Sequence, residues 1–331
     1  MKIIKIIIIF YLFFTSNVFS NNKDFNNWVI KFKARAAEEG ISIQTINLIM
    51  DNASYLPNVI KYDRFQPEFY EDTKTYINKR VNRKKINNGR TLYNRNISKI
   101  IEIEKKFFVE KELLLALMGI ETNYGKYLGK MNIVSSLSTL SFDKRRSEFF
   151  TKELIILLKL VDKKIINPNI LFGSWAGAFG NFQFMPRTIK DYAIDYDSNT
   201  IIELKKIDDS FASAANYLNK IGWKKNEPCF YRVELKENFP TIYLNTSAKK
   251  IKNKKKLIYF KKYIKNFDSI DVNKNKFVGI ITPDKDIIPD SLNLAPAFIV
   301  FENFEIILSW NRSLRFALAV CTLKNNFKNE L

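Results

Sequence analysis

One carboxylate, Glu121, stands out because it ends a continuous apolar stretch, 113–120, and glycines follow it at positions 125 and 129. A carboxyl group at the end of an apolar helix is desolvated, which disfavours its charged form and raises its pKa. Such a group holds a proton near neutral pH and can donate it to a poor leaving group, such as a glycosidic oxygen. The alternative is a structural acid that reaches solvent or pairs with a buried arginine.

A second stretch, FGSWAGAFGNFQFMPRT at 172–188, combines three glycines with aromatic side chains and with Ser174, Asn181 and Gln183. Glycines let a ligand approach the backbone, aromatic faces stack on sugar rings, and short polar side chains bond hydroxyl or N-acetyl groups. Six of the ten glycines fall between residues 119 and 180, which indicates a functional core in this third of the chain. Glycine-aromatic loops also serve packing, and the lack of a Gly-Lys-Ser/Thr ending disfavours a phosphate loop.

The first twenty residues have the pattern of a secretory signal. Two lysines precede an apolar stretch, 6–14, and Val18 and Ser20 stand at the spacing that signal peptidase reads. Because the stretch is short for a membrane span, we expect a mature chain that starts near Asn21 in the periplasm. An uncleaved signal that anchors the protein to the membrane is the alternative.

The composition narrows the possible chemistry. With 46% hydrophobic and 27% charged residues in 331, the chain is a folded protein long enough for more than one domain. It contains no histidine, so Ser-His-Asp, Cys-His and histidine-ligated zinc sites are excluded. Export permits a disulfide between Cys229 and Cys321, but two buried thiols are an equally good interpretation.

The net charge of +20 usually indicates a nucleic-acid partner. An exported protein rarely meets nucleic acid, so we expect none and favour an anionic polymer outside the cytoplasm, such as cell wall carrying peptide carboxylates. The segment 249–265 contains nine lysines. A solvated edge or loop is our first interpretation of this lysine segment, and contact with a wall polymer is the second.

The elements that must position these groups are mainly helical. Apolar residues recur three to four positions apart from 25 to 111 and again from 110 to 223, which predicts helices, with breaks at 55–58 and 87–90.

After residue 223 apolar residues alternate with charged ones, and 296–308 predicts two strands around Glu302 and Asn303. The final stretch, 310–331, returns to helical spacing. We therefore predict an α+β fold that is mainly α, with a small β domain near the C-terminal end.

Five ordered motifs resemble the lytic murein transglycosylase B family: GIETNYG, STLSFDKRRSEFF, GSWAGAFGNFQFMPRTIKDYAIDYD, SAANYLNKIGW and WNRS. The resemblance covers nearly the whole mature chain. It implies a signal peptide at 1–20, an N-terminal helical domain at 21–110 completed by 310–331, a lysozyme-like catalytic core at 111–223, and an inserted β domain at 224–309.

Members of this family cleave the β-1,4 bond between N-acetylmuramic acid and N-acetylglucosamine without water. The muramic 6-hydroxyl attacks its own anomeric carbon and leaves a 1,6-anhydro end. Glu121 matches the single catalytic acid, which protonates the leaving oxygen and then, as carboxylate, takes the proton of the 6-hydroxyl. A hydrolytic muramidase and a non-catalytic peptidoglycan-binding protein are the alternatives.

The resemblance also assigns the residues around Glu121. Ser174 matches a serine that contacts the acid, and Asn311 an asparagine of the returning C-terminal segment. Trp310 stands where the family often has tyrosine, which keeps an aromatic face but moves the polar group. The other matches are Tyr76, which lines the site, the arginine pair Arg145 and Arg146, and the groove residues Gln183, Phe184, Met185 and Tyr217. For Met185 and Tyr217, the alternative to a groove role is core packing. For Arg146, the alternative to substrate contact is a structural ion pair.

A calcium-binding loop of some members corresponds to DYDSNTIIELKKIDD here. Its possible ligands are Asp195, Asp197, Asn199, Asp209 and a carbonyl near Ile201, but Thr200 replaces the glycine that permits the sharp turn. We therefore favour a loop without calcium and expect no required cofactor. The expected partners are peptidoglycan glycan strands and, with them, cell-wall synthesis proteins, and we expect a monomer.

Overall fold

The structure, a computed structural model, describes residues 22–66, 70–285 and 294–331. The predicted signal at 1–20 lies outside these residues. The chain divides into two compact units, the first made of Met1–Phe65 and Leu128–Lys205 and the second of Gln66–Tyr127 and Lys206–Leu331. Each unit is therefore built from two separate segments of sequence. The mainly helical α+β prediction is confirmed, whereas the division at residues 110, 223 and 309 stays a prediction.

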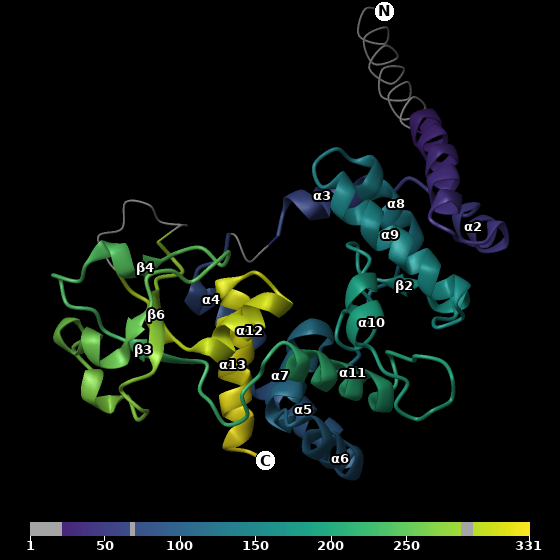
Figure 1. The fold of residues 1–331 in the computed structure, drawn as a ribbon. Helices are drawn as coiled ribbons and strands as arrows, with labels where there is room; N and C mark the ends of the chain where they lie inside the picture. The colour runs from purple at the N-terminus through teal and green to yellow at the C-terminus, as the bar shows by residue number, and fades with distance from the viewer. Residues whose placement is uncertain (1–21, 67–69, 286–293) are drawn as a thin grey trace, which may run out of the picture. The chain divides into compact units, whose positions relative to one another are not determined.

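The first unit is helical, with a small two-stranded sheet (Figure 1). Helix α8 packs against α9, which also contacts α2 and α10. The β1 and β2 strands pair antiparallel, with Met131 opposite Gly173. The elements are a helix at 22–38, α2 (Ile43–Met50), α3 (Pro57–Arg64), β1 (Met131–Asn132), α8 (Ile133–Phe142), α9 (Ser147–Asp162), the 3₁₀ helix η2 (Pro168–Ile170), β2 (Phe172–Gly173) and α10 (Pro186–Tyr192).

The second unit has a helical part in which α13 runs along α7 (Figure 1). Residues 113–119 of α7 are all buried, which explains the unbroken apolar run in the sequence. The helices are α4 (Thr73–Arg80), α5 (Arg83–Arg95), α6 (Ile97–Phe107), α7 (Lys111–Thr122), α11 (Ile207–Lys220), α12 (Glu302–Trp310) and α13 (Leu314–Lys328).

The β part of the second unit is a five-stranded sheet with the order β3-β7-β6-β4, and β5 pairs with β6. The β4 strand runs parallel to β6, and the other pairs are antiparallel. A separate cluster of apolar side chains, including Phe260, Val278 and Ile299, forms its core. The elements are β3 (Phe230–Val233), η3 (Thr241–Tyr243), β4 (Leu244–Asn245), β5 (Lys255–Lys256), η4 (Leu257–Tyr263), η5 (Phe267–Ser269), β6 (Phe277–Ile281) and β7 (Ala297–Val300).

A disulfide joins Cys229, just before β3, to Cys321 in α13. The two cysteines are therefore disulfide-bonded, and the alternative of two buried thiols is wrong. The disulfide fixes the start of the sheet to the helix that packs along α7.

All nine lysines of the lysine segment 249–265 are exposed. Side chains three apart lie in one row of a 3₁₀ helix, and in η4 the row with Leu257 and Phe260 is buried. The neighbouring rows, which carry Lys261 and Lys262, face solvent. This agrees with a solvated surface, and contact with a wall polymer stays a prediction.

Two predicted elements are wrong. The expected break at 87–90 is the middle of α5, in which Gly89 is buried. The absence of a side chain at Gly89 makes room for Phe327, because a Cβ there would lie 2.3 Å from Cζ of Phe327. The expected second strand within 296–308 is α12, because Phe304, Ile307 and Leu308 are buried at helical spacing. Short apolar runs do not distinguish a strand from a buried helix.

Within the described residues, no single helix has the length and apolar character to cross a membrane. The pair α12 and α13, bent by 116°, meets those two criteria together, and most of the apolar side chains of both helices are buried in the second unit.

Candidate active site

Glu121 lies in the last turn of α7, and its side chain is half-buried. The helix ends directly after it because Asn123, Tyr124 and Gly125 take left-handed backbone conformations, with φ of 49°, 61° and 80°. Asparagine and glycine adopt this conformation at low cost, and they commonly end helices in this way. The sequence therefore holds a carboxyl group at the boundary between a buried helix and a tight turn.

Trp310 is a hydrogen-bond partner of Glu121. Its indole Nε1 donates a 3.0 Å hydrogen bond to Oε1 of Glu121, across 189 residues of sequence. The indole stacks on the ring of Tyr217, with ring centroids 5.1 Å apart and an interplanar angle of 28°. The Tyr217 hydroxyl in turn donates to the carbonyl of Ser309, at 3.2 Å. Three predicted site residues therefore form one connected group, and Tyr217 fixes the orientation of the indole.

Gly119 lies in the last turn of α7, where the side chains of Tyr124 and Lys85 approach it closely. A Cβ at this position would lie 2.6 Å from the hydroxyl oxygen of Tyr124. That hydroxyl is buried, makes no hydrogen bond to any residue that the structure describes, and has a pKa raised well above its usual value by burial. Nζ of Lys85, from α5, donates a 2.7 Å hydrogen bond to the carbonyl of Gly119. Sequence reasoning missed Lys85, because a lysine among many carries no signal of this contact.

Tyr76 is buried on α4, with 3% of its surface exposed. The guanidinium carbon of Arg80, one helical turn later, lies 3.5 Å from the centroid of its ring. Arg80 also pairs with Glu71, at 2.9 Å. Tyr76 is thus held in a cation–π contact, and its predicted place in the site stays a prediction.

Asn311 follows α12 directly, with its backbone in an extended conformation. Its amide donates to the carbonyl of Ile307, and its carbonyl accepts from the amide of Ser313. These bonds turn the chain from α12 into α13. The Asn311 side chain is half-buried one residue beyond Trp310.

In the first unit, Ser174 and Gln183 shape the glycine-rich stretch. Oγ of Ser174 accepts a 3.0 Å hydrogen bond from the amide of Ala178 and closes the turn around Gly177. Gln183 has a left-handed backbone, with φ of 51°. Its Nε2 donates to the carbonyls of Gly180, at 3.0 Å, and Leu128, at 3.3 Å. Both polar side chains therefore order the loop itself.

Phe184 and Met185 lead from this stretch into α10. Phe184 is buried, and it exchanges both backbone hydrogen bonds with Phe179, at 3.0 and 3.1 Å. Met185 is half-buried and precedes the proline that starts α10. Phe184 packs in the core of the first unit, and the predicted groove role of both residues stays a prediction.

Arg145 and Arg146 both contact buried Asp63. Nη2 of Arg146 lies 2.5 Å from Oδ1 of Asp63, and Nη1 of Arg145 lies 3.6 Å from Oδ2. The Arg146 guanidinium also lies over the ring of Phe150, 4.7 Å from its centroid. The alternative of a structural ion pair for Arg146 therefore has direct support.

The possible calcium loop is held in a turn by hydrogen bonds between its own residues. Asp195 accepts from the amides of Asn199, at 3.1 Å, and Thr200, at 2.7 Å, and Asp197 accepts from the amide of Asn199. Thr200 has the left-handed backbone expected of the missing glycine, with φ of 76°. Oδ1 of Asn199 accepts from the amide of Ile201. The oxygen donors suit calcium by type, whereas Asp209 lies buried in the first turn of α11, in the second unit.

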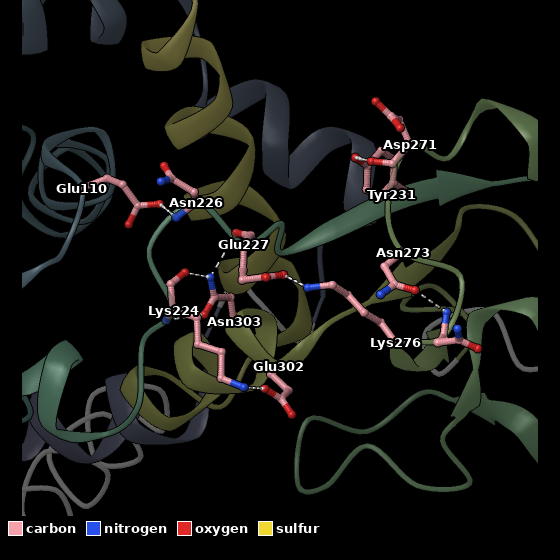
Figure 2. Close-up of polar contacts among 11 residues, drawn as sticks. Glu110, Lys224, Asn226, Glu227, Tyr231, Asp271, Asn273, Lys276, Glu302 and Asn303 are labelled. Carbon is pink, nitrogen blue, oxygen red and sulfur yellow. Dashed lines mark hydrogen bonds and ion pairs between the residues drawn. The ribbon is translucent and has the colours of Figure 1, made fainter.

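Glu110, just before α7, is a buried acid that sequence reasoning did not single out. It accepts hydrogen bonds from Nε1 of Trp223, at 2.5 Å, and the amide of Asn226, at 2.9 Å, and its Oε1 lies 3.0 Å from Nζ of Lys324. Figure 2 shows the contact with Asn226. Burial raises its pKa, but Lys324 and the two hydrogen bonds outweigh burial and hold the pKa below its usual value.

The same junction is held by Asn303 of α12. Its side chain bonds both the amide and the carbonyl of Lys224 and the carbonyl of Glu227 (Figure 2). Glu227 pairs with Lys276, at the start of β6. The turn that leads from α11 to Cys229 is thus fixed to the N-terminal end of α7, to α12 and to the sheet.

Comparison with known proteins identifies the family. The transglycosylase SLT domain profile matches residues 24–325. The chain is 34% identical over 153 residues to the membrane-bound lytic murein transglycosylase B of Escherichia coli K12, covering 46% of this chain and 42% of that relative. The matched region thus spans less than half of that relative's length.

Solved structures agree in fold. The SltB3 protein of Pseudomonas aeruginosa, in complex with NAG-NAM-pentapeptide, is 28% identical, with a TM-score of 0.81 over 92% of this chain and 79% of that one. The Escherichia coli lytic transglycosylase Slt35, in complex with bulgecin A, is 24% identical, with a TM-score of 0.75 over 94% of this chain and 95% of that one. The chain belongs to the transglycosylase SLT domain family, as its resemblance to the lytic murein transglycosylase B family predicted.

Proposed function

We propose that the protein is a lytic transglycosylase. It cleaves the β-1,4 bond between N-acetylmuramic acid and N-acetylglucosamine in peptidoglycan without water and forms 1,6-anhydromuramic acid ends. The observation that carries the proposal is Glu121, held by Trp310 at the buried end of α7 in a chain of this family. The complex of SltB3 with NAG-NAM-pentapeptide supports glycan strands as the substrate.

The geometry of Glu121 suits a single carboxyl group with two successive tasks. An oxygen that accepts a hydrogen bond from an indole N–H is a poor place for an acidic proton, so we assign the transferred proton to Oε2. After Glu121 protonates the leaving oxygen, the Trp310 hydrogen bond stabilises the resulting carboxylate. That carboxylate then accepts the proton of the muramic 6-hydroxyl. An intramolecular nucleophile needs no second carboxylate to activate water.

Digestion of purified sacculi followed by mass spectrometry tests this function. We expect anhydro ends, which are lighter than reducing ends by one water, and we expect Glu121→Gln to release no product. Glu112→Gln is the matched control, because Glu112 lies in the first turn of the same helix. Reducing ends would instead identify a hydrolytic muramidase. Equal release by wild type and Glu121→Gln would identify a binding protein whose Glu121 has no catalytic part.

We place the enzyme in the periplasm, as a monomer that acts on glycan strands beside cell-wall synthesis proteins and binds no nucleic acid. The Cys229–Cys321 disulfide supports export, because disulfides persist in oxidising compartments. Fractionation of cells that produce the full chain tests the location. The protein should appear with periplasmic markers, or with membranes if the signal is not cleaved, and recovery in the cytoplasm would refute it.

We propose that the reaction needs no cofactor and that the 195–203 loop keeps its fold without calcium. The support is the set of hydrogen bonds by which Asp195 and Asp197 already hold the turn at Asn199 and Thr200. The thermal midpoint should then be the same in chelator and in added calcium. A rise of several degrees with calcium would show that the ion is part of the native structure.

A further inference from the structure

Lys85 is a charged group of the second unit that the proposed mechanism leaves unused. It lies on α5, its side chain is half-buried, and Nζ donates its 2.7 Å hydrogen bond to the carbonyl of Gly119. Among the residues that the structure describes, no carboxylate pairs with this ammonium. A partly buried charge without a counter-ion is costly, so a specific contact at this point indicates a role beyond solubility.

The contact lies where it can control the end of α7. Gly119 is two residues before Glu121, in the last turn. The carbonyls of a last turn carry the negative end of the helix dipole, and a cation beside them stabilises the turn. The same Gly119 carbonyl accepts the amide of Asn123, the residue at which the chain leaves the helix, at 3.2 Å. Lys85 therefore binds the carbonyl that closes the turn carrying Glu121.

We propose that Lys85 is a positioning residue for Glu121: its charged form holds the last turn of α7 and so sets the orientation of the carboxyl group for proton transfer. The inference rests on the proposed transglycosylase function. Because Lys85 contacts the backbone of α7, it affects the rate of the chemical step and leaves substrate binding unchanged. Misplacement of a catalytic group by about 1 Å is enough to lower a rate by about a hundredfold.

The surroundings of Lys85 make its charge sensitive to pH. Burial, followed by the charge of Arg80 from α4, lowers the pKa of Lys85 to about 8. Arg80 is itself paired with Glu71, and Glu330, beyond α13, is paired with Arg83 and Arg90. Tyr124, from the segment after α7, has a pKa raised by burial and stays neutral. The charge of Lys85 is therefore lost within the pH range of an ordinary activity assay.

The test compares Lys85→Arg with wild type from pH 6 to pH 9 on purified sacculi. Arginine keeps a charged donor throughout this range. With a pKa of about 8, roughly a tenth of wild-type Lys85 is charged at pH 9. The ratio of the Lys85→Arg rate to the wild-type rate should thus rise about tenfold between pH 7 and pH 9. Taking this ratio cancels every pH effect that the two proteins share.

Lys84 supplies the matched control, because it is the neighbouring lysine on the same helix and is exposed. The ratio for Lys84→Arg should stay flat. At pH 7, Lys85→Met should lower kcat about tenfold or more with an unchanged KM, whereas Lys84→Met should change neither. A flat ratio for Lys85→Arg in an active enzyme overturns the inference. A wild type that releases no product at any pH overturns the proposed function instead.

Discussion

Loss of the Cys229–Cys321 disulfide should destabilise the second unit strongly. The cysteines are 92 residues apart in sequence, and a cross-link over such a loop lowers the entropy of the unfolded chain by an amount worth about 4.6 kcal/mol at 25 °C. Both sulfurs are buried, and the bond joins the segment before β3 to α13. Its removal should therefore be felt by α13 and by α7, against which α13 packs.

The perturbation is the double substitution Cys229→Ala with Cys321→Ala, measured by urea unfolding and by thermal unfolding. For a unit of roughly 190 residues, about 4 to 5 kcal/mol corresponds to a fall of roughly 10 to 20 °C in the midpoint. The thermal midpoint of wild type in reductant should fall by a similar amount. Reductant should leave the midpoint of the double variant unchanged, which controls for effects of the reductant other than cleavage of the disulfide. A change below about 1 kcal/mol would refute the reasoning, because it would mean that the cross-link hardly restricts the unfolded chain.

Three further perturbations test packing and buried charges within the two units. Gly89→Ala should destabilise the protein by about 1–2 kcal/mol in urea unfolding, because the new methyl group meets Phe327 and Tyr124; Asn87→Ala, on the exposed side of the same helix, should not. Glu110→Gln should cost about 3 kcal/mol or more, because it leaves buried Lys324 without its counter-ion, and a cost below about 1 kcal/mol would contradict the ion pair's importance. Burial raises the pKa of Glu153, so its protonated form favours the fold and the contribution of this one group to stability falls as pH rises above the usual carboxyl range. The free energy of unfolding of Glu153→Gln, relative to that of wild type, should thus increase from pH 4 to pH 7. A difference that stays constant with pH would contradict the raised pKa of Glu153.

Sequence patterns predicted the elements that are long and strongly periodic, and they failed where packing decides the conformation. The apolar run before Glu121 identified α7 because every residue from 113 to 119 is buried. Gly89 suggested a break, yet it is there to let Phe327 approach α5. The strands are two to five residues long, too short for alternation to establish their ends, and α12 follows β7 after a single residue, Phe301.

The candidate site shows the same limit at the level of single residues. Glu121, Tyr217 and Trp310 were found through ordered motifs, but the hydrogen bond between Glu121 and Trp310 spans 189 residues, and no local pattern encodes it. Lys85 and Glu110 were missed because a lone charged residue in a highly charged chain has no distinctive spacing. Their roles come from burial and from partners that only the folded chain brings together.

In the proposed mechanism, the place of Glu121 at the end of α7, and not in its middle, suits a two-step proton transfer. The negative end of a helix and partial burial both disfavour a carboxylate in general, which is the influence that an acid step needs. The indole N–H of Trp310 acts in the opposite sense, because it donates to Oε1 of Glu121 and would stabilise the carboxylate for the base step. A carboxyl group in a purely apolar helix would be a poor base, and one in water a poor acid. On the proposed mechanism, the last turn of α7 balances the two influences, and one residue can serve both steps.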